Sequence, residues 1–436
     1  MKAVAFKQLR YVLSVTSGAT PDSGKSEYWD GDIRWITPED VSTIDGYWIT
    51  ETRRKITREG YNSCGTSLVP RGSIVLTKRA PIGQLAILAE PACSNQGCFL
   101  LTPRGAQDSR YYYYWLATQA DRLQVLGRGS TFMELSTDEL KALHVPEPPL
   151  PQQRAIADYL DRETARIDAL IGAKERLLAL LAEKRRALIT RAVTSGLDPH
   201  APMRDSGIPW LGEIPAHWGV VRLRFLTRLI EQGWSPQAEN REPSMEEWGV
   251  LKVNAVNQGR FDDTAAKALP LSADPKVELE VRRGDFLVTR SNTPSLVGDA
   301  CFVEATRPRL MLCDLVYRLH LDEKCVDGRF LGYFITLPIG RHQIEAEARG
   351  TSASMVKISQ EHIKDWVVPL PPPAEQRAIV DHITEETARL DALRAATEHS
   401  IALLKERRAA LISAAVTGQI EVSACAASTA DREAVP

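Results

Sequence analysis

A long segment of this chain occurs twice, and the repeat limits what the protein can fold into more than any other feature. Residues 152–194 align without a gap on residues 375–417, with 25 identities in 43 positions at an offset of 223 residues. Chance does not produce such a match. The chain is therefore an internal duplication with one copy of a common unit in each half.

Each copy of the repeat reads as one long helix. A proline cluster precedes it, at 146–151 and at 369–373, and about forty positions without proline follow. At ~1.5 Å per residue each helix is about 60 Å long, too long for burial within one compact domain. Apolar residues three, four or seven apart predict a coiled-coil seam, interrupted by Lys174, Thr397 and Ser400. The predicted seam residues are Ile167, Leu170, Leu177, Leu181 and Leu188, then Ile383, Leu390, Leu393, Leu404 and Leu411.

The relative direction of the two helices follows from chain order. The second globular segment starts where the first helix ends and finishes where the second helix begins, which predicts an antiparallel pair. A parallel pair would need the linker after Gly196 to run back along the whole rod fully extended. We therefore expect one globular domain at each end of the rod, related by a pseudo-twofold axis.

The globular segments before the helices share landmarks in one order. Gly18-Ala-Thr-Pro21 corresponds to Gly233-Trp-Ser-Pro236, and 72–78 corresponds to 284–290. Short apolar runs between Gly and Pro, such as 73–77 and 285–289, are typical of strands. The aromatic runs 111–116 and 330–335 read as buried helices and not as base-stacking platforms. The expected fold class is α+β.

Composition gives no sign of a membrane protein, a disulfide framework or a zinc site. The seven cysteines include no Cys-x-x-Cys, and Cys93 and Cys98 read as strand residues and not as a metal pair. No apolar run approaches the ~20 residues that span a bilayer, so a soluble cytoplasmic protein is expected. The net charge of −2 is unusual for a nucleic-acid binder and indicates that partner subunits help to grip a phosphate backbone.

Two enzyme interpretations fail, the first on spacing and the second on a missing motif. Residues 18–26 resemble a phosphate-binding loop, but five residues separate the glycines where the motif has four. The following stretch, 27–35, reads as turn and strand where a phosphate cradle needs a helix. A self-sufficient methyltransferase needs a tetrapeptide such as Asn-Pro-Pro-aromatic, which this chain lacks. No catalytic residue and no metal ligand is predicted.

The chain resembles the specificity subunits of type I restriction-modification systems over nearly its whole length. Their long helix follows a proline-rich turn and Gln-Arg-x-Ile, matched by Gln153-Arg-Ala-Ile156 and Gln376-Arg-Ala-Ile379. It ends in Ala-Val-Thr-x-Gly, matched at 192–196 and shifted slightly at 415–419. The bridge 205–218, followed by Arg222-Leu-Arg224, is the sharpest match. The short amino-terminal start has no counterpart of that bridge.

The resemblance implies a non-catalytic, DNA-binding subunit in which each domain reads one half of a bipartite target. Two methyltransferase subunits, docked on the helices and central region, would methylate adenine, and restriction subunits would complete the complex. S-adenosylmethionine, ATP and Mg²⁺ are then expected on partner subunits, with no cofactor on this chain. The rival hypothesis is a duplicated coiled-coil scaffold that binds protein and not DNA. The expected organisation is recognition domains at 1–147 and 218–370, helices at 148–196 and 371–419, a central linker at 197–217 and a disordered tail at 420–436.

Candidate reading residues are those with paired donors or acceptors in loop-like settings, because such groups match base edges. For any one of them a solvated surface residue is the plainer interpretation. In the first domain the candidates are Lys78, Arg79, Asn95, Gln96, Arg128, Ser130 and Thr131. In the second domain they are Arg290, Asn292, Thr293, Arg349 and Thr351.

Overall fold

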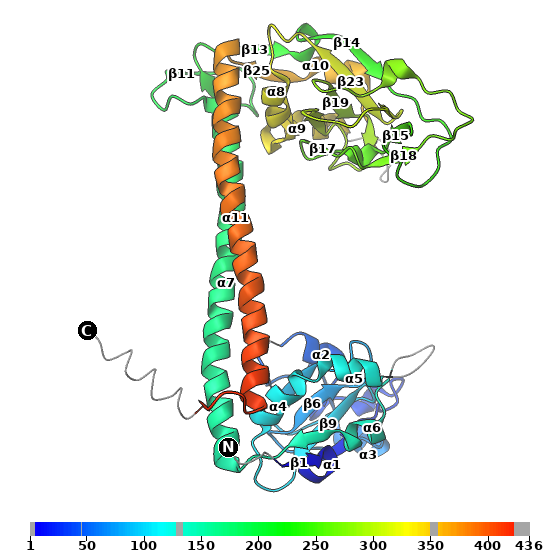
Figure 1. The fold of residues 1–436 in the computed structure, drawn as a ribbon, viewed down its shortest axis with the longest axis vertical. Helices are drawn as coiled ribbons and strands as arrows, with labels where there is room; N and C mark the ends of the chain where they lie inside the picture. Colours follow the sequence, from blue (N-terminus) through cyan, green and yellow to red (C-terminus); the bar gives the residue numbers. More distant parts are fainter. Residues whose placement is uncertain (1–4, 45, 128–133, 349–355, 423–436) are drawn as a thin grey trace. The chain divides into compact units, whose positions relative to one another are not determined.

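The computed structural model describes residues 5–44, 46–127, 134–348 and 356–422. The chain divides into two compact units, residues 1–175 with 398–436, and residues 176–397. Each unit holds one globular domain and parts of two long helices, α7 (Leu150–Ser195) and α11 (Pro373–Val416) (Figure 1). The first unit contains the start of α7 and the end of α11, and the second contains the reverse.

The two long helices are antiparallel in both units. In the first unit Arg408, near the end of α11, forms an ion pair with Asp168, near the start of α7. In the second unit Arg185, near the end of α7, forms one with Asp391, near the start of α11. Both partners of the second pair lie 223 residues from their counterparts in the first, so the duplication extends to the contacts between the helices.

The seam of the coiled coil agrees with the predicted one only in part. Ile167, Leu181 and Leu390 are buried as expected, whereas Leu170, Leu177 and Leu393 are 48%, 37% and 47% exposed. Consecutive buried positions lie three, four, seven or ten residues apart, which fits a heptad seam in which some positions are not fully buried. Along α7 the seam passes through Leu160, Thr164, Ile167, Ile171 and Leu181, and along α11 through Ile383, Thr387, Leu390, Thr397 and Ile401.

The first domain is built on a five-stranded sheet with the strand order β2-β9-β6-β7-β4 and a three-stranded sheet with the order β5-β3-β8. Its strands are β1 (Phe6–Gln8), β2 (Leu13–Ser17), β3 (Trp29–Ile36), β4 (Trp48–Ile49), β5 (Arg54–Ile56), β6 (Ile74–Thr77), β7 (Leu85–Leu88), β8 (Ala92–Ser94), β9 (Cys98–Pro103) and β10 (His144–Pro146). Its helices are α1 (Leu9–Val12), η1 (Ser26–Tyr28), α2 (Pro38–Ser42), α3 (Arg58–Ser63), α4 (Ser109–Ala117), α5 (Ala120–Leu126) and α6 (Thr137–Ala142).

Alternation along strand β6 separates the core of the first domain into two layers. Ile74 and Leu76 face the cluster that contains the aromatic residues of α4, and Val75 faces a second cluster behind the sheet. The predicted buried aromatic helix is confirmed, because Tyr111 and Trp115 are no more than 4% exposed. The α4 cluster also takes in apolar residues from the start of α7 and the end of α11, which fixes the domain to the helices.

The second domain repeats this plan with more irregular sheets. Its main sheet has the order β14-β23-β19-β21. The strands are β11 (Met203–Asp205), β12 (Glu213–Pro215), β13 (Gly219–Arg222), β14 (Thr227–Gln232), β15 (Gly249–Leu251), β16 (Val256–Asn257), β17 (Arg260–Phe261), β18 (Ala266–Ala268), β19 (Phe286–Thr289), β20 (Ser291–Asn292), β21 (Ala300–Phe302), β22 (Leu310–Met311), β23 (Val316–Leu321), β24 (Val356–Lys357) and β25 (Val367–Leu370). The helices are η2 (Leu223–Phe225), η3 (Val253–Ala255), η4 (Val277–Leu279), α8 (Gly328–Thr336), α9 (Pro338–Ala348) and α10 (Gln360–Asp365).

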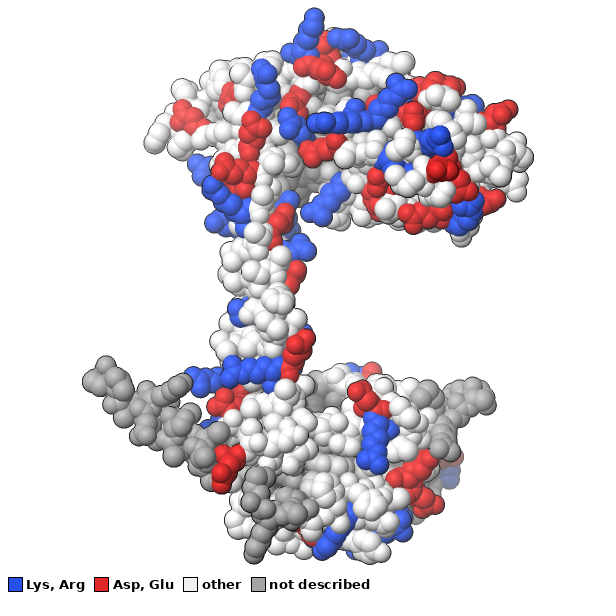
Figure 2. Space-filling model, viewed as in Figure 1, with Lys and Arg blue, Asp and Glu red and all other residues white. Residues whose placement is uncertain are grey.

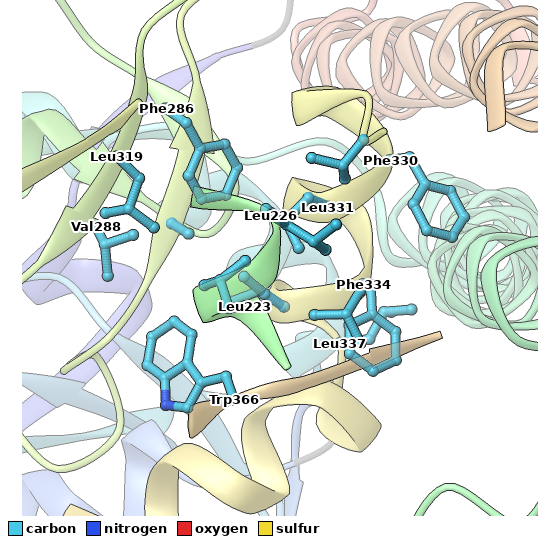
Figure 3. Packing of buried hydrophobic residues seen from close by; sticks show 14 of the residues in the cluster. Leu223, Leu226, Phe286, Val288, Leu319, Phe330, Leu331, Phe334, Leu337 and Trp366 are labelled. Carbon is cyan, nitrogen blue, oxygen red and sulfur yellow. The ribbon is translucent and has the colours of Figure 1, made fainter. Parts of the chain in front are cut away.

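Figure 3 shows the main core of the second domain, where Phe286 and Val288 of β19 meet the apolar face of α8. Phe330 and Phe334 of α8 are fully buried, as the sequence predicted for this aromatic run. The expected fold class, two α+β domains with an antiparallel helix pair, is confirmed.

A buried glutamine attaches each domain to the start of its long helix. Gln153 of α7 accepts from the backbone N–H of Asp108 at 2.9 Å and donates to the carbonyl of Pro148 at 2.8 Å. Gln376 of α11 makes the equivalent bonds to Asp327 at 2.8 Å and Pro371 at 2.8 Å. The glutamine of the repeated Gln-Arg-Ala-Ile sequence is therefore a structural clamp.

The central bridge belongs to the second unit. Trp218 donates its ring N–H to Glu375 Oε1 at 3.1 Å, and Nε2 of His217 lies 2.8 Å from Glu375 Oε2. In the first unit Ile420 and Val422, which follow α11, pack against the core of the first domain. The ordered chain thus continues past residue 419, where we expected a disordered tail to begin, and residues 423–436 lie outside the described part.

Within the described ranges no helix is both long and apolar enough to cross a membrane. Six cysteines, all except Cys425, lie in these ranges and are free thiols. Burial raises the pKa of Cys93 and Cys98 to about 12, so both are inert strand residues.

Candidate nucleic-acid interface

The loops that follow strands β6 and β19 are built alike. The hydroxyl of Thr77, the last residue of β6, donates to the Pro81 carbonyl at 2.7 Å and accepts from the Gln84 N–H at 3.0 Å. Thr289, at the end of β19, makes the same two bonds to Leu296 at 2.9 Å and Asp299 at 3.0 Å. Each threonine therefore closes a loop on its strand end, which limits the motion of the residues between.

A glycine turns each loop back toward its strand. Gly83 has φ +92° and Gly298 has φ +68°, conformations that glycine adopts without strain. Their N–H groups bond to the carbonyls of Thr77 and Thr289 at 3.0 and 2.9 Å.

A returning segment crosses each loop at the same place. The N–H of Leu135 donates to the carbonyl of Lys78 at 2.9 Å, and the N–H of Ile358 donates to that of Arg290 at 2.9 Å. The next residue in each segment caps a short helix, with Ser136 accepting at 3.1 Å and Ser359 at 3.2 Å. Lys78 and Arg290 are therefore equivalent positions.

The residues beside that contact differ between the domains. The backbones of Arg79 and Glu134 pair in an isolated antiparallel β-bridge, and those of Ser291 and Lys357 also pair antiparallel, at the equivalent position of the second domain. The first domain thus has an arginine opposite a carboxylate, where the second has a serine opposite an ammonium group. The two loops therefore share a backbone conformation but carry opposite charges on the returning segment, at Glu134 and Lys357.

In the first domain the two loop cations share one carboxylate. Lys78 Nζ lies 2.9 Å from Glu134 Oε1, and Arg79 Nε lies 3.0 Å from Glu134 Oε2. The hydrogen bond from Lys78, followed by that from Arg79, holds the pKa of Glu134 below its usual range against the opposing effect of burial. The three charges form one fixed group at neutral pH.

The predicted amide residues of the first domain lie beside this group. The N–H of Lys78 donates to the carbonyl of Gly97 at 2.9 Å, which places the turn at 95–97 against the loop. Asn95 accepts from the Gly97 N–H at 2.9 Å, and Gln96 accepts from the hydroxyl of Thr20. Four predicted residues, Lys78, Arg79, Asn95 and Gln96, are therefore together in space.

The equivalent turn of the second domain holds Arg290. Its Nη1 donates to the Asp314 carbonyl at 3.3 Å, and its guanidinium lies 6.0 Å from the Tyr317 ring centroid. Asn292 accepts from the N–H of Thr293 at 2.8 Å. The predicted residues Arg290, Asn292 and Thr293 share one loop. The remaining candidates, Arg128, Ser130, Thr131, Arg349 and Thr351, lie outside the described residues.

A close backbone crossing explains the glycine that the two globular segments share. A Cβ at Gly18 would lie 2.0 Å from the Ser94 carbonyl oxygen, and one at Gly233 would lie 2.2 Å from the Cys313 oxygen. Any side chain there would displace the turn that supports the loop. By contrast, the phosphate-loop reading of 18–26 fails in the structure, since only the short helix η1 follows, at Ser26–Tyr28.

Sequence reasoning missed Glu134 and Lys357, although a signal for them exists. The two residues are 223 positions apart, as are all equivalent residues of the long helices. Extending the helix alignment backward without a gap pairs Glu134-Leu-Ser136 with Lys357-Ile-Ser359. The few identities in that stretch concealed the match.

Positive charge near the loops is confined to a few side chains. Figure 2 shows Lys and Arg interspersed with Asp and Glu on the visible face of each unit, without a continuous basic surface. In the described ranges no group of three or more His, Cys, Asp or Glu is placed to hold a metal ion. What the loops offer is a small set of guanidinium, ammonium and amide groups on rigid strand ends, the groups that recognise base edges and phosphates.

The fold and these loops define a class of protein with two similar domains on a duplicated helix pair, each presenting its own set of polar recognition groups. Residues 1–178 match the family model described as the type I restriction modification DNA specificity domain. Residues 1–178 thus carry the domain of the type I restriction-modification specificity subunits, and nearly the whole chain is similar to members of that family.

Individual relatives agree with this assignment. The chain is 27% identical to the type I restriction enzyme MjaIX specificity subunit of Methanocaldococcus jannaschii over 431 residues, 95% of this chain and 93% of that protein. It is 32% identical to the EcoEI specificity subunit of Escherichia coli over 211 residues, which are 48% of this chain and 35% of that subunit.

Solved structures share the fold. A chain solved in a study of complex assembly and conformational transition of the type I R-M system superposes with a TM-score of 0.70 at 18% identity, covering 96% of this chain and 99% of that one. The HsdS subunit of Thermoanaerobacter tengcongensis superposes with a TM-score of 0.55 at 16% identity, covering 96% of this chain and 98% of that one.

Proposed function

We propose that this chain reads a bipartite DNA sequence within a type I restriction-modification complex, with one half of the target read by each domain. The observation that carries the proposal is the pair of matched loops. Their backbones are held by equivalent bonds, yet Arg79 and Glu134 in one loop stand where Ser291 and Lys357 stand in the other. A common scaffold with different recognition groups is what two different half-sites require.

The chemistry belongs to partners in this proposal. The chain acts as a non-catalytic subunit in the cytoplasm, and two methyltransferase subunits bind S-adenosylmethionine and methylate adenine. Restriction subunits that use ATP and Mg²⁺ complete the complex. This chain itself holds no cofactor.

Exposed leucines support the number of methyltransferase subunits. Leu180 is 61% exposed and its equivalent Leu403 is 51% exposed, and Leu170 and Leu393 match at 48% and 47%. These residues lie outside the seam and recur at the 223-residue offset, so each exposed leucine has an equivalent on the other long helix. Equivalent exposed leucines on both helices suit two copies of one partner, in the same way that an isologous interface repeats its contacts.

The test is reconstitution with the methyltransferase subunit. The complex should contain two copies of that subunit for each chain, and it should transfer labelled methyl groups to DNA at a split sequence. Glutamate at both Leu180 and Leu403 should release the partner, while glutamate at the exposed loop residue Leu271 should not. Undiminished methylation without this chain would reject the proposal, and methylation without sequence preference would favour the protein-binding scaffold.

A further inference from the structure

The two cations that contact Glu134, Lys78 and Arg79, differ in burial and in their other contacts. Lys78 Nζ contacts Glu134 at 2.9 Å and Ser17 Oγ at 3.2 Å, and it lies 5.1 Å from the Phe99 ring centroid. Its side chain is only 12% exposed. Lys78 is therefore committed to the fold and is a poor candidate for contact with DNA.

Arg79 is held by Glu134, but its guanidinium remains exposed to a ligand. Its side chain is 47% exposed, and it bonds to Glu134 through Nε. Among the residues the structure describes, none accepts a hydrogen bond from its terminal nitrogens Nη1 and Nη2. A bond through Nε restricts rotation of the guanidinium while the two terminal nitrogens remain as a planar pair of donors. Such preorganisation lowers the entropy lost on binding.

The second domain cannot repeat this arrangement. Ser291 occupies the position of Arg79 and is 1% exposed, and exposed Lys357 occupies that of Glu134. Arg290, the equivalent of Lys78, is held by a backbone carbonyl and by Tyr317, with no carboxylate in the matching position. The arginine–carboxylate pair is thus specific to the first domain.

We infer that Arg79 reads a guanine in the first half-site through Nη1 and Nη2, and that Glu134 is the positioning residue that aims it. Guanine offers two acceptors, O6 and N7, on its major-groove edge, and their spacing matches an arginine fork. The inference rests on the proposed function and adds to it one residue, one base and one domain. At the matching position of the second domain, the described residues Ser291 and Lys357 offer no such pair.

The experiment selects sequences from a random DNA library with the assembled complex and compares the enriched motifs of four proteins. They are the unaltered complex, Arg79→Lys, Glu134→Gln and the control Glu90→Gln. Glutamine has one acceptor oxygen where glutamate has two, so it cannot hold both cations. Lysine keeps the charge but lacks the fork. Glu90 is an exposed residue of the same domain, and Glu90→Gln removes the same charge as Glu134→Gln.

We expect one guanine position of the first half-site to lose roughly tenfold or more of its preference in both Arg79→Lys and Glu134→Gln. All other positions, and the whole motif of Glu90→Gln, should stay as in the unaltered complex. The second half-site serves as an internal measure of folding and assembly, because a different domain reads it.

Three results would overturn the inference. An unchanged motif in Arg79→Lys would assign Arg79 to a phosphate, which lysine also binds. An equal loss at every position of the first half-site in Glu134→Gln would make Glu134 a purely structural residue. An unchanged motif in Glu134→Gln would remove its positioning role. A complex without any enriched motif would instead reject the proposed function itself.

Discussion

Arg408 of α11 holds Asp168 of α7 in a two-bond ion pair, with Nε–Oδ1 at 2.9 Å and Nη2–Oδ2 at 3.1 Å. The pair Arg185–Asp391 repeats the contact 223 residues away, with Nη1–Oδ2 at 2.7 Å. Each pair joins the end of one helix to the start of the other, so together they record both the antiparallel direction and the register of the coiled coil.

Exchanging the charges of one pair tests that register. Arg185→Asp should lower the free energy of unfolding by about 0.5–1 kcal/mol, because the partners are 30% and 48% exposed and such pairs are weak. The exchange Arg185→Asp with Asp391→Arg should recover most of the loss. Thermal unfolding of the two single variants and the double variant measures the coupling. Purely additive effects would mean that the residues do not meet in solution.

The buried glutamine Gln153 should contribute more to the free energy of unfolding than the exposed ion pair does. Gln153→Leu leaves the N–H of Asp108 and the carbonyl of Pro148 without their partner in a buried site, which should cost about 1–3 kcal/mol. The melting temperature should fall by about 2–4 °C per kcal/mol for a unit of this size. Gln152→Leu, at the exposed neighbouring position, is the matched control. Equal melting temperatures for the two variants would contradict the clamp.

The sequence predicted the duplication, the helices and the antiparallel direction because these depend on spacing and chain order alone. It placed the seam incorrectly at Leu170 and Leu177, since the neighbouring Ile171 and Leu178 satisfy the same spacing. Buried Thr164 and Thr387 occupy positions where a seam search looks for apolar residues. Which of two adjacent residues faces the partner depends on packing that a single sequence does not show.

The loops were predictable in position but not in role. Strand ends and paired donors identified Lys78 and Arg79 as neighbours, yet the sequence could not separate them. Their difference comes from Glu134, more than fifty residues away in the chain, and from the burial of Lys78 beside Phe99. Contacts of this range arise from the fold and have no local pattern.

A buried arginine makes the second domain sensitive to acid. Arg318 is 7% exposed and bonds through Nε to Glu231 at 2.7 Å and through Nη1 to Asp285 at 3.1 Å. Burial would raise the pKa of Glu231, but hydrogen bonds from Arg318 and His320 outweigh this effect and hold the pKa below its usual range. A carboxyl pKa lowered by folding adds stability that is present above the unfolded value and lost as pH falls through the folded value.

Arg318→Leu should therefore cost about 3–5 kcal/mol near neutral pH, because it leaves the carboxylates without their partner. As pH falls from neutral through the range in which carboxyl groups titrate, the variant should lose less stability than the unaltered chain. Arg228→Leu removes an exposed pair with Asp322 and should change stability by less than about 1 kcal/mol. Urea unfolding across this pH range checks both. Parallel pH profiles for the Arg318 variant and the unaltered chain would contradict the assignment.

Arg290 and Asn292 should affect only the second half-site. Arg290→Ala or Asn292→Ala should cost ~1–3 kcal/mol of discrimination there if the residue contacts a base edge, and the first half-site should be read as before. Binding is measured with DNA variants altered in one half-site at a time. A uniform loss with a flatter salt dependence would assign the residue to a phosphate, and no loss would show that another loop reads the DNA.

The most direct test of the account is sequencing of methylated bases in cells that express the complete system with either the unaltered chain or a chain whose loop 290–298 carries substitutions. The account predicts a split methylation motif for the unaltered chain. The altered chain should change one half of that motif and leave the other half and the gap between them intact. A continuous motif, or a change in both halves at once, would contradict the claim that each domain reads its own half of the target.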